Sequence, residues 1–262
     1  NLSLALEPKA KGDEEKISSG LHRLQDEDPT FGVTINAETH QTLISGMGEQ
    51  HLDIIINKLK SKFNVSVNLI DPKVPYRETI KKKVKVEGKH KKQSGGHGQY
   101  GHVWIEFEPG EKQELTFEEK IFGGSVPKQY HPAVEKGLQE SIQKGVLAGY
   151  PVVNLKATLV DGSYHDVDSS EMAFKIAAHL AYKKGLEQAS PVLLEPIAHV
   201  EVFVPDSYMG DVIGDLNKRR GRILGMNPCD NGLQQVVAEV PQAEMFKYAT
   251  ELRSMTQARG NF

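Results

Sequence analysis

The apolar residues of this chain switch between strand spacing and helix spacing in a fixed order, which restricts the folds open to it. Leucines alternate from Leu2, and apolar residues at i, i+4 and i+7 follow from Asp13 until a DPT turn. A hairpin pattern at 31–46, a second helical pattern and an alternating run at 65–70 complete this part. The order β-α-β-β-α-β predicts a split β-α-β sandwich with its helices on one sheet face.

The C-terminal part of the chain repeats this order. Residues 199–204 alternate as a strand, residues 209–216 carry an apolar stripe at helical spacing, and a hairpin and a second helix follow. Basic residues from Lys218 to Arg220 stand in the last turn of the first helix, where cations suit the helix dipole. Gly221 is expected to end that helix. This part therefore predicts a second sandwich, of order β-α-β-β-α.

The middle of the chain contains the glycine-rich segment HKKQSGGHGQYGHV, residues 90–103. Its glycines fit both the dinucleotide fingerprint and a kinase phosphate loop. A strand pattern at 103–107 follows the glycines, whereas a dinucleotide site needs a helix there to hold the pyrophosphate. No V-A-I-K, H-R-D, D-F-G or P-loop motif completes a kinase or another nucleotidase. A nucleotide-binding enzyme that uses the Gly96–Gly101 loop is therefore kept only as the alternative.

A second polar segment, DGSYHDVDSSE, joins an alternating run at 153–159 to a helical pattern. Asp168 and Glu171 have the spacing of a capping box, so we expect the helix to begin beside them and to end at Gly185. The segment holds the residue types of a hydrolase triad, but no G-x-S-x-G turn accompanies them. The histidines of the two segments lack the spacing of a zinc motif.

Composition excludes several classes of protein. A single cysteine, Cys229, leaves no disulfide framework and no thiolate cluster within one chain. No apolar run approaches the roughly 20 residues that span a bilayer, and the start is too short and too acidic for a signal peptide, so a cytoplasmic location is expected. The net charge of the chain is only −3, but the stretch from Lys81 to Lys92 contains seven lysines and a single acidic residue, Glu87. This local field favours phosphate, but lysines also protect exposed strand edges.

The two polar segments share small residues, amide and imidazole groups and nearby lysines, which together suit RNA. Lysine contacts to phosphate would position the RNA, while Gln93, Ser94 and His165 would bond ribose hydroxyls or base edges. The segments contain no RNP1 motif and few aromatic residues, so we expect recognition of RNA shape rather than of single-stranded sequence. The glycines would let a narrow hairpin tip reach between RNA strands. Two ordinary solvated loops are the competing interpretation.

Seven motifs then stand in one order along the chain: LALEPKAKGDEEKISSGLHRLQDEDPTF, LISGMGEQHLDII, QSGGHGQYGHV, DGSYHDVDSSEMAFKIA, LLEPI, YMGDVIGDLNKRRGRILGM and AEMFKYATELRS. Together they resemble bacterial translation elongation factor G over essentially the whole chain. The resemblance implies an α+β fold in which two split β-α-β (ferredoxin-like) sandwiches, residues 1–78 and 194–262, flank a central α+β domain, residues 79–193. That central domain would have a ribosomal protein S5 domain 2-like fold. Residues 1–78 would be the third domain of the factor, residues 79–193 the fourth and residues 194–262 the fifth.

The resemblance also implies partners. The central domain would enter the decoding region of the small ribosomal subunit and contact tRNA and mRNA during translocation. The fifth domain would contact the sarcin-ricin loop of large-subunit RNA, and the third, with GMGEQHLDII, would transmit nucleotide state from the GTPase domain of the same protein. The fragment would have no catalytic residue, cofactor or metal of its own and no membrane partner, because GTP and Mg would belong to that GTPase domain. A further strand and helix are expected after Phe262.

Matched residue by residue, the motifs assign the expected RNA contacts. The two tip loops would comprise Gln93, Ser94, Gly95, Gly96, His97 and Gly98 in the first, and Ser163, Tyr164, His165, Asp166 and Asp168 in the second. The flank of the tip would add Lys89, Lys91 and Lys92, and the fifth domain would add Lys218, Arg219, Arg220 and Arg222. His97 stands where the housekeeping factor is expected to have arginine. A specialised paralogue therefore stays open, as does a ribosomal protection protein, against which the intact DGSYHDVDSS segment argues.

Overall fold

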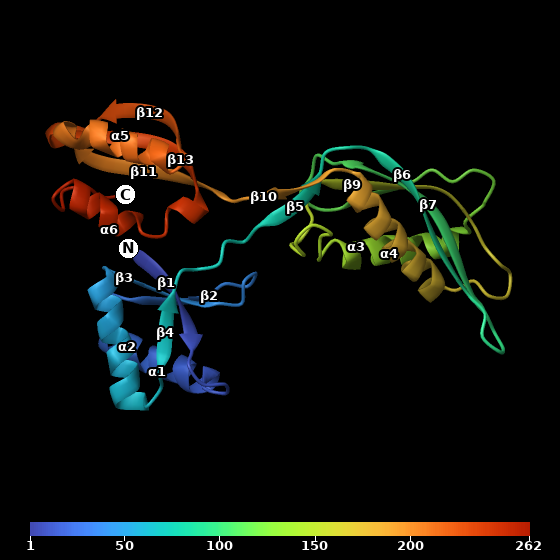
Figure 1. The fold of residues 1–262 in the computed structure, drawn as a ribbon, viewed down its shortest axis with the longest axis horizontal. Coiled ribbons are helices and arrows are strands. Elements are labelled where there is room, and N and C mark those ends of the chain that lie inside the picture. The colour runs from blue at the N-terminus through green and yellow to red at the C-terminus, as the bar shows by residue number, and fades with distance from the viewer. The chain divides into compact units, whose positions relative to one another are not determined.

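The structure is a computed structural model that describes all of residues 1–262. The chain divides into two compact units, one of residues 76–194 and the other of residues 1–75 with 195–262. Buried apolar side chains form three separate clusters. We name the stretches that hold them the N-terminal segment (1–75), the central segment (76–194) and the C-terminal segment (195–262). Helices and strands are mixed in each, so the fold is α+β (Figure 1).

The N-terminal segment has the predicted order β-α-β-β-α-β. Its elements are β1 (Leu2–Pro8), α1 (Glu14–Glu27), β2 (Gly32–Ile35), β3 (Thr42–Gly46), α2 (Glu49–Phe63) and β4 (Val67–Ile70). The sheet has the order β2-β3-β1-β4 with every neighbour antiparallel, as in a split β-α-β sandwich. Apolar residues at helical spacing on α1 and α2 are buried against it, as their periodicity predicts: Ile17, Leu21, Leu24, Leu52, Ile55 and Leu59.

The C-terminal segment has the predicted order β-α-β-β-α. Its elements are β11 (Ile197–Pro205), α5 (Met209–Lys218), β12 (Arg222–Pro228), β13 (Leu233–Pro241) and α6 (Tyr248–Met255). The sheet order is β11-β13-β12. Val212 and Leu216 bring the buried stripe of α5 onto this sheet, and Tyr248 and Leu252 do the same from α6.

Gly221 does not end α5 in the predicted way. The left-handed residue after the helix is Arg220, with φ 60°, and Gly221 follows it by donating its N–H to the carbonyl of Leu216 at 2.9 Å. A Cβ on Gly221 would lie 2.5 Å from that carbonyl oxygen. Glycine is therefore required there by close approach of the backbone, whereas the strained conformation falls on an arginine.

The central segment contains a four-stranded sheet with two helices on one face (Figure 1). Its elements are β5 (Arg77–Ile80), β6 (Val84–Lys92), β7 (Gln99–Pro109), β8 (Thr116–Glu119), α3 (His131–Ser141), β9 (Leu155–Ser163), α4 (Glu171–Gln188) and β10 (Pro191–Leu194). The sheet order is β6-β7-β9-β8, and β5 pairs separately with β10. The hairpin of β6 and β7 extends past the end of α4 (Figure 1). No helix of the chain is both long and apolar enough to cross a membrane.

The predicted capping box on α4 is wrong in detail. The N-cap is Ser170, whose Oγ accepts the N–H of Ala173 at 3.1 Å, and the Asp168 carboxylate points elsewhere. The helix also continues beyond Gly185 to Gln188. A Cβ at Gly185 would meet the ring of Phe107 at 2.5 Å, so this glycine serves helix-to-sheet packing rather than termination.

Two glycines on the hairpin bring α4 into direct contact with the sheet. A Cβ at Gly88 on β6 would lie 2.1 Å from the carbonyl oxygen of Ala177, and one at Gly101 on β7 would lie 2.3 Å from that of Ala173. Because no side chain fits in either place, the helix backbone lies directly on both strands. Gly101 thus serves the packing of α4 on the sheet, whereas the sequence analysis counted it among the glycines that narrow the hairpin tip.

A buried carboxylate fixes the two-stranded β5–β10 ribbon to the rest of the central segment. Glu78 is 1% exposed, and its oxygens accept the backbone N–H groups of Leu147, Ala148 and Tyr150 at 2.8, 3.1 and 2.8 Å. A buried charge is tolerated where such donors satisfy it. Sequence patterns alone gave no sign of this lock, since its partners lie about 70 residues apart.

Candidate nucleic-acid interface

The two polar loops of the central segment lie together at one end of its sheet. The register of β6 and β7 pairs Lys92 with Gln99, so residues 93–98 form the turn of the hairpin. The second loop connects β9 to α4, and an isolated bridge pairs Tyr100 with Ser169. We call residues 93–98 and 163–169 together the tip.

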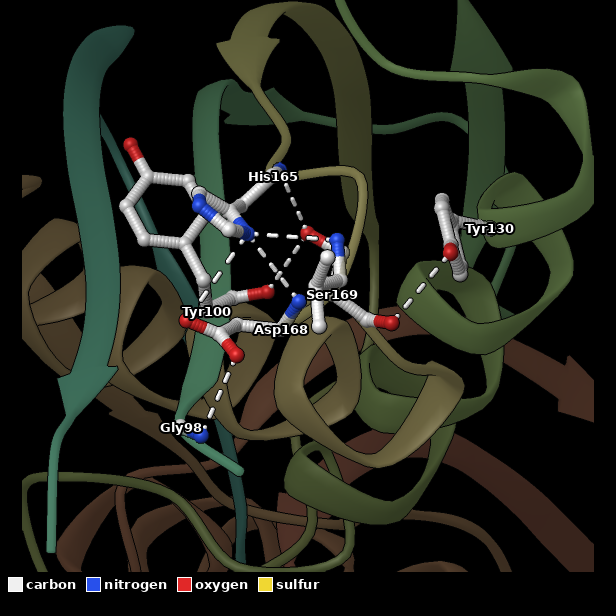
Figure 2. Close-up of polar contacts among 7 residues, drawn as sticks. Gly98, Tyr100, Tyr130, His165, Asp168 and Ser169 are labelled. Carbon is white, nitrogen blue, oxygen red and sulfur yellow. Dashed lines mark hydrogen bonds and ion pairs between the residues drawn. The ribbon is translucent and has the colours of Figure 1, made fainter. Parts of the chain in front are cut away.

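Backbone and side-chain hydrogen bonds join the two loops of the tip (Figure 2). The N–H of Tyr100 donates to the carbonyl of Asp168 at 2.9 Å, and the N–H of Gly98 donates to Oδ1 of the same residue at 3.1 Å. The hydroxyl of Ser169 donates to the carbonyl of Tyr100 at 2.9 Å. The loops therefore form one ordered unit rather than two separate surface loops.

His165 uses one ring nitrogen inside the tip and leaves the other free. Its Nδ1 accepts the N–H groups of Val167 at 3.2 Å and Asp168 at 3.1 Å, and its backbone N–H donates to Ser169 Oγ at 2.8 Å. Because Nδ1 accepts, the proton of the neutral imidazole lies on Nε2. The side chain is 55% exposed and its ring lies 6.4 Å from that of Tyr100. Nε2–H is the donor that this residue can offer to a ligand.

The predicted tip residues separate into an exposed set and a supporting set. Gly98 and Asp168 support the tip, because a Cβ at Gly98 would lie 2.7 Å from the Asp168 carboxylate, which is only 18% exposed. Gly95 and Gly96 form the turn with φ values of 38° and 142°. Five predicted residues are exposed and make no side-chain hydrogen bond within the protein: Gln93, Ser94, His97, Tyr164 and Asp166.

Three residues that support the tip, Tyr100, His102 and Tyr130, were missed by sequence reasoning. The predicted residue Ser163 contacts two of them: its Oγ lies 2.6 Å from Tyr100 Oη and 2.6 Å from His102 Nδ1, so it joins β9 to β7 at the base of the tip. Tyr130 stacks on Phe174 with ring centroids 4.6 Å apart. The alternation along β7 indicates which face Tyr100 and His102 share, but no local pattern shows that Ser163 pairs with them.

The lysines beside the tip are largely free of carboxylates. Lys91 and Lys92 are exposed without an ion pair, and Lys89 Nζ lies 5.8 Å from the centroid of the Tyr100 ring. At the other end of β6, Glu106 and Glu108 bind Lys83 at 3.1 and 3.6 Å and raise its pKa. Lys83 is thus neutralised by carboxylates, whereas Lys91 and Lys92 beside the tip are not.

The four basic residues predicted in the C-terminal segment divide into two that are paired with acids and two that are free: Arg219 and Arg220, and Lys218 and Arg222. Arg219 is held inside the segment: it binds Asp215 at 2.8 Å and Glu251, and it lies over the Tyr248 ring at 5.0 Å. Its side chain is only 11% exposed. Burial raises the pKa of the Tyr248 hydroxyl above its ordinary value.

Arg220 also has partners within the C-terminal segment. It binds Glu195 at 2.6 Å and Glu244 at 3.1 Å, and its hydrogen bond holds the pKa of the Glu195 carboxyl below the ordinary value. Lys218 and Arg222 are exposed and without a partner. Of the four predicted residues, these two are the ones available to bind phosphate.

The chain contains no group of three or more histidine, cysteine, aspartate or glutamate side chains that could hold a metal ion.

Comparison with known families gives three consecutive matches: "Elongation Factor G, domain III" over residues 1–71, "Elongation factor G, domain IV" over 72–190, and "Elongation factor G C-terminus" over 192–262. A solved crystal structure from Thermus thermophilus is similar over the whole chain, with 47% identity and a TM-score of 0.87. The chain spans 39% of that protein's length. The chain therefore belongs to the elongation factor G family of translation factors.

Proposed function

We propose that this chain is the C-terminal part of a ribosomal translocase, in which the tip contacts the decoding region and promotes movement of tRNA and mRNA. The observation that carries the proposal is the junction of the two loops through Asp168 and Ser169. It holds the tip in one conformation while the side chains at its surface stay without partners. An ordered surface loses little conformational entropy on binding, so its contacts favour the bound state more strongly.

The chemistry of the exposed tip suits RNA. Gln93 offers an amide, Ser94 a hydroxyl and His165 an Nε2–H, and each can bond a ribose hydroxyl or a base edge. Lys91 and Lys92 would contact phosphates on the flank. Asp168 would act by positioning the loops and not by touching RNA.

The remaining parts of the chain would have separate roles. Residues 1–78, 79–193 and 194–262 would be the third, fourth and fifth domains of the factor. Lys218 and Arg222 would contact phosphates of large-subunit rRNA at the sarcin-ricin loop. The third domain, residues 1–78, would transmit nucleotide state from a GTPase domain of the same protein, which would hold GTP and Mg. The protein would work in the cytoplasm, and no catalytic group is assigned to this fragment.

The alternative within the family is a specialised paralogue or a ribosomal protection protein. The exposed His97 at the hairpin turn is the residue that favours a paralogue, because its ring would meet RNA at a place where arginine is expected. Translocation assays of the full-length protein distinguish the housekeeping role from a specialised role. A factor that translocates is a housekeeping type, whereas one that only recycles or releases ribosomes is specialised.

Ribosome binding by the chain tests the proposal against other classes. The chain should sediment with ribosomes and should do so much less with other structured RNA. It should show no saturable binding of ATP, GTP or NAD below millimolar concentration. Tight nucleotide binding with hydrolysis would instead support the enzyme that uses the Gly96–Gly101 loop, and equal binding to any structured RNA would support a general RNA-binding protein.

A further inference from the structure

The N-terminal segment contains a cleft that the proposed function does not use. It lies between α1 and the β2–β3 hairpin and has a volume of about 680 Å³, which is within the range of small-molecule sites. All of its lining residues lie between positions 6 and 42, so this segment forms the cleft alone. β2 is the terminal strand of its sheet, so no neighbouring strand closes the cleft at that edge.

The inner wall of the cleft is apolar. Leu6 of β1 and Ile17 and Leu21 of α1 line it, and all three belong to the core of the segment. Two residues of β2 continue this wall outward: Val33, which is partly buried, and Ile35, which is 72% exposed. An apolar group bound here would remove this surface from water, which favours binding.

Polar side chains line the α1 side of the cleft and have no partner in the protein. Glu14, Ser18 and His22 stand at i, i+4 and i+8, so they form one row along the helix. None of them forms a side-chain hydrogen bond or an ion pair, and the imidazole of His40 across the cleft is equally free. Glu14 is the one acidic residue of the lining, which contains no lysine or arginine.

The hairpin side of the cleft is held by hydrogen bonds of its own turn. Asn36 Oδ1 accepts the N–H of Glu38 at 2.9 Å, and the carbonyl of Asn36 accepts the N–H of His40 at 2.8 Å. Gln41 Oε1 accepts the N–H of Lys73 at 2.7 Å, which joins the hairpin to the chain after β4. The cleft is therefore formed before any ligand binds, and binding requires little ordering of the protein.

We propose that this cleft binds a small, mainly apolar molecule that carries one amino group. Its hydrocarbon part would lie against the apolar wall, and its ammonium group would pair with Glu14 at the opening. Ser18 and His22 would add hydrogen bonds along the same side. An anionic ligand would meet the Glu14 carboxylate and no compensating lysine or arginine, so a cation is favoured.

Naphthylmethylamine is a suitable probe, and the methyl signals of the 262-residue chain can report where it binds. The probe should shift the methyl signals of Leu6, Ile17 and Ile35 in a saturable way, with a dissociation constant on the order of 1 mM or less. Naphthylmethanol, the neutral analogue, should bind about two- to fivefold more weakly, as for an exposed ion pair, and naphthoate more weakly still. Glu14→Gln should remove the difference between amine and alcohol. Glu15→Gln, which changes an exposed acid outside the cleft, should keep it.

A second pair of variants tests the cleft itself. Ser18→Phe places a ring in the cleft and should abolish saturable binding, whereas Ser19→Phe adds the same ring to an exposed position of α1 outside it and should not. Equal loss in both variants, no saturable shift with the amine, or equally tight binding of naphthoate would overturn the proposal. Methyl shifts that depend on chain concentration without a probe would mean that a second copy of the chain covers the cleft, and would also overturn it. The assay contains neither RNA nor ribosomes, so its outcome is independent of the role proposed for the tip.

Discussion

The backbone N–H of Gly98 donates a hydrogen bond of 3.1 Å to Oδ1 of Asp168, a residue 70 positions later in the chain. The bond joins the hairpin turn to the loop before α4. A Cβ on Gly98 would lie 2.7 Å from the same carboxylate, so glycine is needed for the contact. The order of the tip depends on this pair.

Asp168→Ala should loosen the tip without unfolding the central segment. The substitution leaves the N–H of Gly98 without its acceptor, which typically costs about 1–3 kcal/mol when the donor is shielded from water. Amide hydrogen exchange at Gly98 and Tyr100 should become faster. Asp166→Ala is the matched control, because that neighbouring carboxylate is exposed and binds nothing. Equal exchange in the two variants would contradict the assigned role of Asp168.

Sequence patterns predicted the elements of the fold well because apolar periodicity reports which face of a strand or helix is buried. The leucines of β1 and the stripe of α5 lie where their spacing places them. The patterns failed where one contact joins distant residues. Ser170 rather than Asp168 caps α4, because the Asp168 carboxylate accepts the N–H of Gly98. No local pattern contains that information.

Gly101→Ala should destabilise the central segment. The added methyl carbon would lie 2.3 Å from the carbonyl oxygen of Ala173, so α4 must move away from β7. Overpacking of this kind typically costs about 1–3 kcal/mol. Urea unfolding followed by the fluorescence of Trp104 should show a lower midpoint, since this is the only tryptophan of the chain and lies on β7.

Gly214→Ala is the matched control for that experiment. Gly214 lies within α5, nothing is within 4 Å of the added carbon, and alanine favours a helix by about 1 kcal/mol over glycine. The Trp104 transition should not change. If both substitutions left that transition unchanged, the close approach of α4 to β7 would be in error.

Lowering the pH should destabilise the N-terminal segment, because it protonates the carboxylate of Asp28. Hydrogen bonds from the Thr30 hydroxyl and from His51 lower the pKa of this carboxyl to about 2. His51 Nε2 lies 2.9 Å from Oδ2, and its Nδ1 accepts the N–H of Met47 at 3.2 Å. Asp28 therefore connects the end of α1 to the turn before α2.

The lowered pKa of Asp28 sets how stability changes with pH. A depressed carboxyl contributes stability above its unfolded pKa, about 4, and loses it as the pH falls through the folded value of about 2. Asp28→Asn should be less stable at neutral pH and should lose less stability between pH 4 and pH 2. Hydrogen exchange of the α1 and α2 amides measures both effects. Asp26→Asn, two residues earlier and exposed, should behave like the parent chain.

Arg219 and Lys218 should differ in what they contribute, although they are neighbours. Arg219→Ala removes bonds to Asp215 and Glu251 from a side chain that is 11% exposed, and it should destabilise the C-terminal segment by about 2 kcal/mol. Lys218→Ala should change stability by about 0.5 kcal/mol at most. Thermal unfolding of the two variants should show this difference.

The exposed residues Lys218 and Arg222, which contribute little to stability, should instead contribute to the salt dependence of ribosome binding. Removing the charge of Lys218 or Arg222 should reduce the slope by nearly one unit for each phosphate that the side chain binds. An unchanged slope in both variants would return these residues to the solvated surface. From sequence the four basic residues from Lys218 to Arg222 look equivalent. Their positions in the sequence do not reveal that Glu251 binds Arg219 and Glu195 binds Arg220.

The outward Nε2–H of His165 can be separated from the Nδ1 acceptor of the same ring by two substitutions. Alanine removes the whole ring, including the Nδ1 that accepts the N–H groups of Val167 and Asp168. Asparagine keeps an acceptor near the Nδ1 position, but its shorter side chain does not reach the place of the outward Nε2–H. His165→Asn should therefore preserve the slow amide exchange of the tip, and His165→Ala should not.

The most direct measurement is the rate of single-round translocation by the full-length parent protein with His165→Asn or Gln93→Ala. Each hydrogen bond removed from a moving RNA state is worth about 0.5–1.5 kcal/mol, so both variants should translocate from several-fold to about tenfold more slowly. Ribosome-stimulated GTP hydrolysis, measured in the same reactions, should stay at the parental rate. Translocation at parental speed in both variants, or a parallel loss of GTP hydrolysis, would contradict the assignment of the tip.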